Sequence, residues 1–175
     1  MAVKAEIKGL ADLAADFLPQ VEKQVKAKTE YAMKETLETF APALEQYLQR
    51  LFAEVYANSP ESPYYTRTGD FVDSLKVKIT QGRGYYGLKI FFDQQELRVG
   101  ITPKGMFNQH ADYNGVPIDI DDLIILESKN KFGTKDALTM WLLSEATQYI
   151  NNNLPNRVKI SLDRALNAPS WKTDF

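Results

Sequence analysis

Residues 63–75 read PYYTRTGDFVDSL, and the hydrophobic pattern of the chain changes across this stretch. Before it, apolar residues recur at helical spacing, whereas after it they alternate as they do in strands. Pro63 fixes its own φ and biases the preceding residue toward an extended conformation, which ends a helix. Gly69 can adopt a positive φ without steric cost. The stretch therefore predicts a reversal of the chain that starts a sheet.

A single helical turn is expected inside this junction. Thr68 and Asp70 can bond nearby backbone groups and begin that turn. Phe71, Val72 and Leu75 then fall on one side of the turn, and we expect that side to face the core. The junction would thus connect a helix to a strand and bury its own apolar residues.

Length, charge and composition limit the classes of protein to which the chain can belong. Its 175 residues suit one domain, and we expect a single α+β domain over residues 1–175. The formal net charge is −2, so overall charge alone favours neither nucleic acid nor a membrane surface as a partner. The absence of cysteine excludes disulfides, thiol catalysis and iron–sulfur ligation. No apolar run approaches the roughly 18 residues of a membrane span, so we expect no membrane partner and synthesis in the cytoplasm.

A long helical arm is predicted over residues 8–57. Its apolar positions follow three- and four-residue steps, most clearly from Phe40 to Val55. Pro19 and Pro42 lie inside this pattern, and each indicates either a kink or the first turn of a new helix. The arm could cover a sheet, pair with a partner helix, or do both.

Three strand candidates follow the junction, at residues 75–79, 86–92 and 97–101. In each of them apolar and polar residues alternate, and the links between them are short and polar. We therefore expect residues 63–102 to form the turn and a three- to four-stranded antiparallel meander. One face of this sheet is apolar, and the helical arm is the nearest element that could bury it.

The rest of the chain is expected to be a loop followed by helices. Glycine and proline punctuate residues 103–133, which predicts a loop region, although apolar residues 118–126 indicate a short helix or a buried strand within it. C-terminal helices are predicted over residues 134–167, packed on the sheet. Three asparagines and Pro155 separate the first of these helices from the second. Residues 168–175 are expected to be a tail.

No strong catalytic pattern is present, and we expect no catalysis, no cofactor and no bound metal. His110 is the only histidine, and with Asp112 it could supply two ligands to zinc or iron. Three protein ligands are usual, so a structural loop histidine is the preferred interpretation. Asp119, Asp121 and Asp122 do not show the full calcium pattern of a glycine turn and a distal carboxylate, although Glu127 lies a few residues on, and a helix start suits them better. A small hydrolase or metalloenzyme built on these residues stays open as a third hypothesis.

The second hypothesis is a nucleic-acid-binding module. Lysines of the N-terminal helix could contact phosphates, and tyrosine pairs at residues 64–65 and 85–86 could stack on bases beside Arg67 and Arg83. Glutamates interspersed among the lysines favour an ordinary solvated helix face instead. The lysines concerned are Lys4, Lys8, Lys23, Lys26 and Lys28.

The order of the elements and one motif carry a resemblance. A long helix and a proline-containing turn precede the motif, and a strand meander follows it. Over roughly residues 10–102, the chain resembles the tail-completion, or head–tail joining, proteins of long-tailed double-stranded DNA bacteriophages. In that family a Thr-Gly pair, an apolar residue two positions on, and Ser with an apolar residue three further on commonly follow the helix. Here these positions are Thr68, Gly69, Phe71, Ser74 and Leu75.

The resemblance implies a structural, non-enzymatic virion component at the neck, or top of the tail, that is made in the host cytoplasm. Such proteins form rings, often hexamers, that sit on the tail terminator and receive the head connector or stopper. Genomic DNA would pass through the ring without sequence-specific binding. Ring contacts are heterologous and close by rotation, and exposed aromatic residues suit their centres. The residues expected at contacts with a neighbouring copy or a partner are Tyr64, Tyr65, Arg67, Thr68, Gly69, Phe71, Tyr85 and Phe91.

Overall fold

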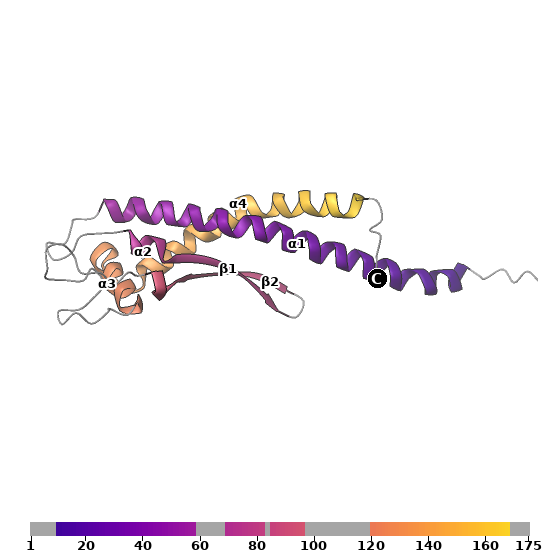
Figure 1. The fold of residues 1–175 in the computed structure, drawn as a ribbon, viewed down its shortest axis with the longest axis horizontal. Helices are drawn as coiled ribbons and strands as arrows, with labels where there is room; N and C mark the ends of the chain where they lie inside the picture. The colour runs from indigo at the N-terminus through magenta and orange to yellow at the C-terminus, as the bar shows by residue number, and fades with distance from the viewer. Residues whose placement is uncertain (1–9, 59–68, 83–84, 97–119, 169–175) are drawn as a thin grey trace, which may run out of the picture. The chain divides into compact units, whose positions relative to one another are not determined.

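The computed structural model describes residues 10–58, 69–82, 85–96 and 120–168 (Figure 1). Its elements in chain order are the helix α1 (Leu10–Ala57), the short helix α2 (Asp70–Asp73), the strands β1 (Leu75–Gly82) and β2 (Tyr85–Phe92), the 3₁₀ helix η1 (Gln94–Glu96), and the helices α3 (Ile120–Phe132) and α4 (Ala137–Asn167). The described residues are thus mostly helical and include one antiparallel pair of strands.

The chain divides into two compact units. The hairpin unit comprises Leu37–Pro155, and the helical unit comprises Met1–Thr36 together with Asn156–Phe175. The division falls inside α1 and inside α4, so each of these helices contributes residues to both units. The sequence predicts one domain over residues 1–175, and that both units fold as one domain stays a prediction.

α1 runs without interruption through both Pro19 and Pro42, so neither proline starts a second helix. A proline inside a helix removes one backbone hydrogen bond and crowds the preceding turn, so packing must compensate. Around Pro42 this compensation is visible, because Phe40 and Leu44 are fully buried whereas Pro42 is exposed. The predicted helical arm is therefore confirmed over the bounds of α1.

The junction into the sheet folds as its sequence predicts. Gly69 precedes α2 with a φ of 88°, in the left-handed region where a side chain would strain the backbone. Its carbonyl accepts the N–H of Asp73 at 2.9 Å, which closes a single helical turn. Phe71 and Leu75 are fully buried, so the apolar side of this turn faces the core. The expected turn and its buried face are confirmed.

Ser74 joins this turn to the hairpin. Its side chain is fully buried, and its hydroxyl donates to the carbonyl of Phe71 at 2.7 Å. Its backbone N–H donates to the carbonyl of Asp70 at 2.9 Å, and its own carbonyl accepts the N–H of Asp93 at 2.7 Å. The hydroxyl, the N–H and the carbonyl of this buried residue thus all have partners, as buried polar groups need.

β1 and β2 pair antiparallel, with Leu75 opposite Phe92 and Gly82 opposite Tyr85. The first two predicted strands are therefore confirmed. The third strand candidate, residues 97–101, lies outside the described residues, so a meander of three to four strands stays a prediction. Within the described part of the chain, the connection that leaves β2 begins as η1.

Side chains of α1 cover the outer edge of β1 at its start. Oε2 of Glu45 accepts the N–H of Val77 at 2.7 Å, and Nε2 of Gln49 donates to the carbonyl of Leu75 at 2.9 Å. These backbone groups belong to an edge strand, which needs partners for its free N–H and C=O groups. Two side chains of the helix therefore supply the bonds that a further strand would otherwise provide.

The prediction of a loop over residues 103–133 is wrong for its last part, because α3 occupies the region from Ile120 onward. The glycines and prolines that indicate a loop all precede Ile118, and none follows before Gly133. Gly133 has a φ of 79° and donates its N–H to the carbonyl of Lys129 at 3.0 Å, so it ends α3 rather than opening the next helix. Residues 103–119 lie outside the described residues.

The predicted break at Pro155 is also wrong, because α4 is one helix from Ala137 to Asn167. Leu154 is half-buried against the core just before the proline. Asn153, which the sequence analysis took for a stop signal, donates Nδ2 to the carbonyl of Tyr149 at 2.8 Å. A side chain that bonds the backbone one turn back is compatible with a helix. Packing together with this bond therefore overrides the local stop signals.

Ser128 of α3 closes the turn into α4. Its side chain is fully buried, and its hydroxyl donates to the carbonyl of Thr134 at 2.6 Å and accepts the N–H of Leu138 at 3.0 Å. A helix start leaves its first N–H groups without intrahelical partners. The start of α4 is therefore capped by a serine from the preceding helix, and α4 begins at Ala137 rather than at residue 134.

One core holds the hairpin unit together, and α1, α2, β1, α3 and α4 all contribute buried side chains to it. Its centre is aromatic. Phe52 lies edge-on to Phe71 and to Phe92, with ring centroids 5.1 and 5.9 Å apart, and Phe71 stacks on Phe92 at 5.2 Å. Because Phe71 comes from the junction, the chain reversal is anchored in the same core as the hairpin and α1.

Candidate functional site

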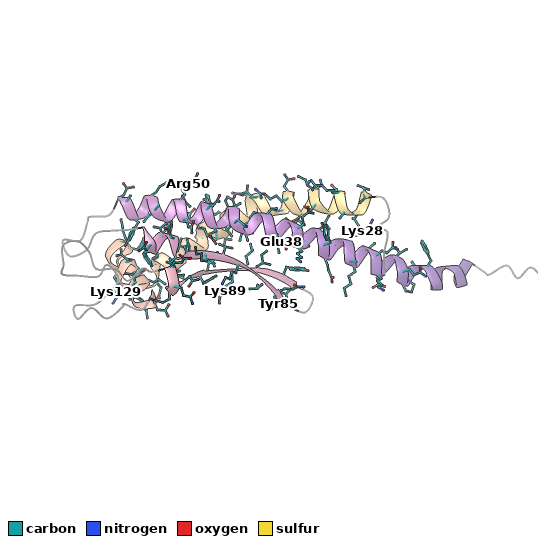
Figure 2. All side chains as sticks on the ribbon, viewed as in Figure 1. Lys28, Glu38, Arg50, Tyr85, Lys89 and Lys129 are labelled. Atoms are coloured by element: carbon teal, nitrogen blue, oxygen red, sulfur yellow. The ribbon has the colours of Figure 1, made fainter. Side chains whose placement is uncertain are left out.

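The hairpin has two chemically different faces, since successive residues of a strand point to opposite sides. The core face carries Leu75, Val77, Ile79, Leu88, Ile90 and Phe92. The opposite side, here called the outer face, carries Lys76, Lys78, Thr80 and Gly82 of β1 and Tyr85, Gly87, Lys89 and Phe91 of β2. Figure 2 labels Lys89 and Tyr85 along β2. The outer face gathers lysines and aromatic residues and is the candidate functional site.

Two lysines lie directly opposite each other at the centre of the outer face. Lys78 pairs with Lys89 in the strand register, and both side chains are exposed. Their Nζ atoms lie 4.9 and 5.5 Å from the centroid of the Phe91 ring. The negative face of an aromatic ring attracts ammonium groups, so Phe91 holds both near one point. Like charges directly opposite in a sheet repel, and the attraction of both ammonium groups to the ring opposes this repulsion.

Lys76 differs from these two lysines because it has an acidic partner. Its Nζ lies 3.3 Å from Oε1 of Glu96 in η1. Among the residues that the structure describes, neither Lys78 nor Lys89 has a carboxylate at ion-pair distance. The outer face therefore presents two ammonium groups that no described acidic side chain neutralises, on a chain whose formal net charge is −2.

Tyr85 stands at the end of the outer face next to the turn. Its side chain is 64% exposed, and its ring lies across Gly82, its partner in the register. A side chain at Gly82 would overlap the tyrosine ring, and a Cβ at Gly87 would lie 2.9 Å from Oγ1 of Thr80. The Tyr85 ring and its hydroxyl thus lie over Gly82, and at both glycines the atoms that an added Cβ would displace belong to a side chain rather than to backbone.

The residues predicted at an oligomer or partner interface lie in different environments. Phe71 is 1% exposed and belongs to the core, so its assignment to an interface is wrong; a residue so buried cannot reach a partner while the hairpin unit stays folded. Gly69 is partly exposed and serves the turn. Tyr85 is exposed and Phe91 is half-buried, and both lie on the outer face. Tyr64, Tyr65, Arg67 and Thr68 lie outside the described residues.

The residues weighed for metal binding are mostly outside the described part of the chain, which includes neither His110, Asp112 nor Asp119. Asp121 lies exposed in the first turn of α3, where its charge complements the helix dipole. No group of three or more histidine, aspartate or glutamate side chains that could hold a metal ion occurs among the described residues.

The lysines of the N-terminal helix do not act alike. Lys23 and Lys26 are exposed on α1, whereas Nζ of Lys28 lies 3.5 Å from the carbonyl of Leu166 and 3.3 Å from that of Ala168. These carbonyls lie at the end of α4, where a positive charge is favoured. Lys28 therefore has a structural role inside the helical unit, and Lys4 and Lys8 lie outside the described residues.

A separate polar cluster in the hairpin unit joins α1 to α4. The Tyr47 ring stacks on Tyr149 with centroids 4.4 Å apart, and its hydroxyl donates to Oε2 of Glu145 at 3.3 Å. Partial burial raises the pKa of Tyr47, the Glu145 carboxylate raises it further, and Arg50 acts in the opposite direction. Tyr47 therefore keeps its proton at neutral pH, and we interpret the cluster as a structural contact.

Sequence reasoning missed the lysine pair. Alternation assigns Lys78 and Lys89 to the polar sides of their strands, but it does not say that they face each other. The signal that could have paired them is the short turn at residues 83–84, because a two-residue loop fixes the register of a hairpin. With Gly82 opposite Tyr85, Lys78 must fall opposite Lys89.

Within the described ranges, no helix is both long enough and apolar enough to cross a lipid bilayer. Comparison of the chain with protein-family models, with curated proteins and with solved structures finds no match.

Proposed function

We propose that this chain is a structural virion protein of a tailed bacteriophage. It would act as a tail-completion or head–tail joining component that forms a ring, expected to be hexameric, at the neck. The observation that carries the proposal is the junction between helix and sheet, where the motif and the order of elements resemble that family. In this proposal the chain has no catalytic role, and residues 97–102 add a further strand to the hairpin.

The junction supports the proposal because each motif residue that the structure describes has a role that requires its type. Gly69 adopts a positive φ, Phe71 and Leu75 fill the core, and Ser74 bonds the turn to the hairpin. Residues with these roles fix one particular connection between the helical arm and the sheet. These roles explain why this chain needs residues of these types at the motif positions.

The exposed aromatic residues support an assembly role. Tyr85 is largely exposed on the outer face, where Phe91 lies half-buried. A ring is built from heterologous contacts, in which one surface of a copy meets a different surface of the next. We assign Tyr85 and Phe91 to one such surface, with the tail terminator and the head connector or stopper as partners on the two sides of the ring.

Electron microscopy of the purified chain, together with native mass spectrometry, tests the ring. We expect closed particles whose mass is a small multiple of the chain mass, six being the expected number, at high concentration or on tails that lack the protein. Tyr85→Ser should weaken assembly because it removes a largely exposed aromatic side chain from the proposed contact. Tyr31→Ser, which changes an exposed tyrosine on α1, is the matched control.

Two results would contradict the proposal. One is a chain that stays monomeric at every concentration and on isolated tails. The other is labelling of virions by a specific antibody that never marks the neck while the protein is abundant in the infected cell. Equal loss of assembly in both tyrosine variants would be compatible with a ring, but it would show that Tyr85 has no special place in the contact surface.

A further inference from the structure

We propose that the outer face of the hairpin binds the phosphate backbone of double-stranded DNA through the ammonium groups of Lys78 and Lys89. The register places these two lysines opposite each other, and Phe91 holds both of their Nζ atoms within 5.5 Å of its ring centroid. The proposed site does not depend on assembly into a ring, because a single copy of the chain contains all of its residues.

The two lysines bring like charges together on the outer face. Two ammonium groups that face each other across a strand pair repel, and their attraction to the Phe91 ring opposes that repulsion. No described carboxylate lies at ion-pair distance from either lysine, whereas Lys76 beside them has Glu96 at 3.3 Å. An anion bound by both Lys78 and Lys89 would replace their mutual repulsion with attraction. The charge on this face therefore suits an anionic partner.

The polar groups of the outer face can all bind phosphate. Lysine binds phosphate as a compact point charge. The described outer face adds the hydroxyl groups of Thr80 and Tyr85, which can donate to phosphate oxygens. Two ammonium groups together with hydroxyl donors suit the several acceptor oxygens of a phosphate.

The shape of the element indicates the form of the nucleic acid. A two-stranded ribbon is one of the elements that the major groove of B-DNA admits. Tyr85 is exposed at the tip with its ring across Gly82, and Phe91 lies half-buried beside the two lysines, so successive aromatic platforms for unpaired bases are missing from the described face. Contacts to phosphates carry no sequence information. The outer face is thus suited to duplex DNA of any sequence.

The expected salt dependence follows from the number of outer-face lysines that pair with no described carboxylate. Each phosphate neutralised on duplex DNA contributes about −0.9 to the slope of log K against log salt. Lys78 and Lys89 therefore predict a slope of about −1.8, which is roughly a twelvefold loss of affinity between about 50 and 200 mM salt. Lys76 adds to this only when Glu96 releases it.

The test measures binding of the full chain to a fluorescent duplex of arbitrary sequence by anisotropy over this range of salt. The double variant Lys78→Gln, Lys89→Gln should bind more weakly than the parent, with a slope near zero. The matched control is Lys129→Gln, Lys135→Gln, which removes the same charge from two exposed lysines outside the hairpin and should keep the parental slope. Glu96→Gln should free Lys76 and steepen the slope to about −2.7.

Several results would overturn the proposal. They are absence of salt-dependent binding by the parent chain, an unchanged slope in the Lys78, Lys89 double variant, or equal losses in the two double variants. Poly-glutamate that binds as tightly as the duplex would assign the face to an acidic protein partner instead. Tighter binding to a single strand than to the duplex would also contradict it. Circular dichroism and thermal unfolding of each variant establish that the exposed substitutions leave the fold intact.

Discussion

At the residue scale, Gly69 determines how the chain enters the hairpin. Its φ of 88° lies in a region that residues with a side chain rarely adopt. A Cβ built at this position would have no atom of the described residues within 4 Å, so overlap with these residues is not what excludes a side chain. The requirement for glycine therefore comes from the backbone alone, and the cost of replacing it can be anticipated from backbone strain.

Gly69→Ala should lower the free energy of unfolding by about 1–2 kcal/mol, because alanine pays the left-handed backbone penalty. Gly69→Asn should lose less, since asparagine tolerates this conformation better through local hydrogen bonds. Urea unfolding followed by circular dichroism measures both variants. An alanine variant as stable as the parent, or an asparagine variant no better than alanine, would mean that the turn relaxes to a different φ.

At the scale of elements, the edge of β1 depends on two side chains of α1. The bonds from Glu45 to Val77 and from Gln49 to Leu75 supply partners for backbone groups of buried strand residues. A buried polar group that loses its partner costs more than the bond itself contributed. The hydrogen-bonded length of the hairpin is therefore coupled to the helix that covers its apolar face.

The double variant Glu45→Ala, Gln49→Ala should reduce the free energy of unfolding by about 2 kcal/mol, on the basis of about 1 kcal/mol or more for each unsatisfied group. Amide exchange of Val77 should accelerate. The control is Gln46→Ala, which truncates an exposed glutamine of the same helix and should change stability by less than about 0.5 kcal/mol. If the free energy of unfolding of the double variant equals that of this control, water satisfies both backbone groups as well as the two side chains do.

Local rules predicted some elements and failed for others. The junction and the first two strands could be predicted because their signals, a glycine at the turn and strict alternation, act within a few residues. α4 could not, since Pro155 and the asparagines before it are stop signals that packing of Leu154 and the bond from Asn153 override. Burial depends on the whole fold, so the sequence near Pro155 does not by itself reveal that Leu154 packs against the core.

The candidate site shows the same limit. The lysines and aromatic residues of the outer face were visible on the polar sides of two separate strands. What makes them a site is that Lys78 and Lys89 share the ring of Phe91, and this depends on register rather than on alternation. For Phe71 the sequence supported two predictions that exclude each other: its place on the core side of the turn is confirmed, whereas its assignment to an interface is wrong because the side chain is buried.

At the scale of the whole molecule, the two units differ in how much core they contain. Among the described residues, buried apolar side chains lie almost entirely in the hairpin unit, and Ala32 is the exception. Large apolar side chains are exposed in both units, and those of the helical unit include Phe17, Leu18, Val25, Ile160 and Leu166. Because burial of apolar surface is the main source of stability, the hairpin unit should carry most of it.

This difference predicts unequal protection along α1, although it is one helix. Amides between Leu44 and Val55 should exchange hydrogen only through global unfolding, whereas those between Leu18 and Val25 should exchange faster through local opening. Exchange followed by mass spectrometry measures both segments. Leu48→Ala, which opens a cavity in the core and costs about 2–5 kcal/mol, should accelerate exchange of the first segment and leave the second unchanged. Uniform protection along α1, or equal acceleration of both segments, would show that its two halves open together.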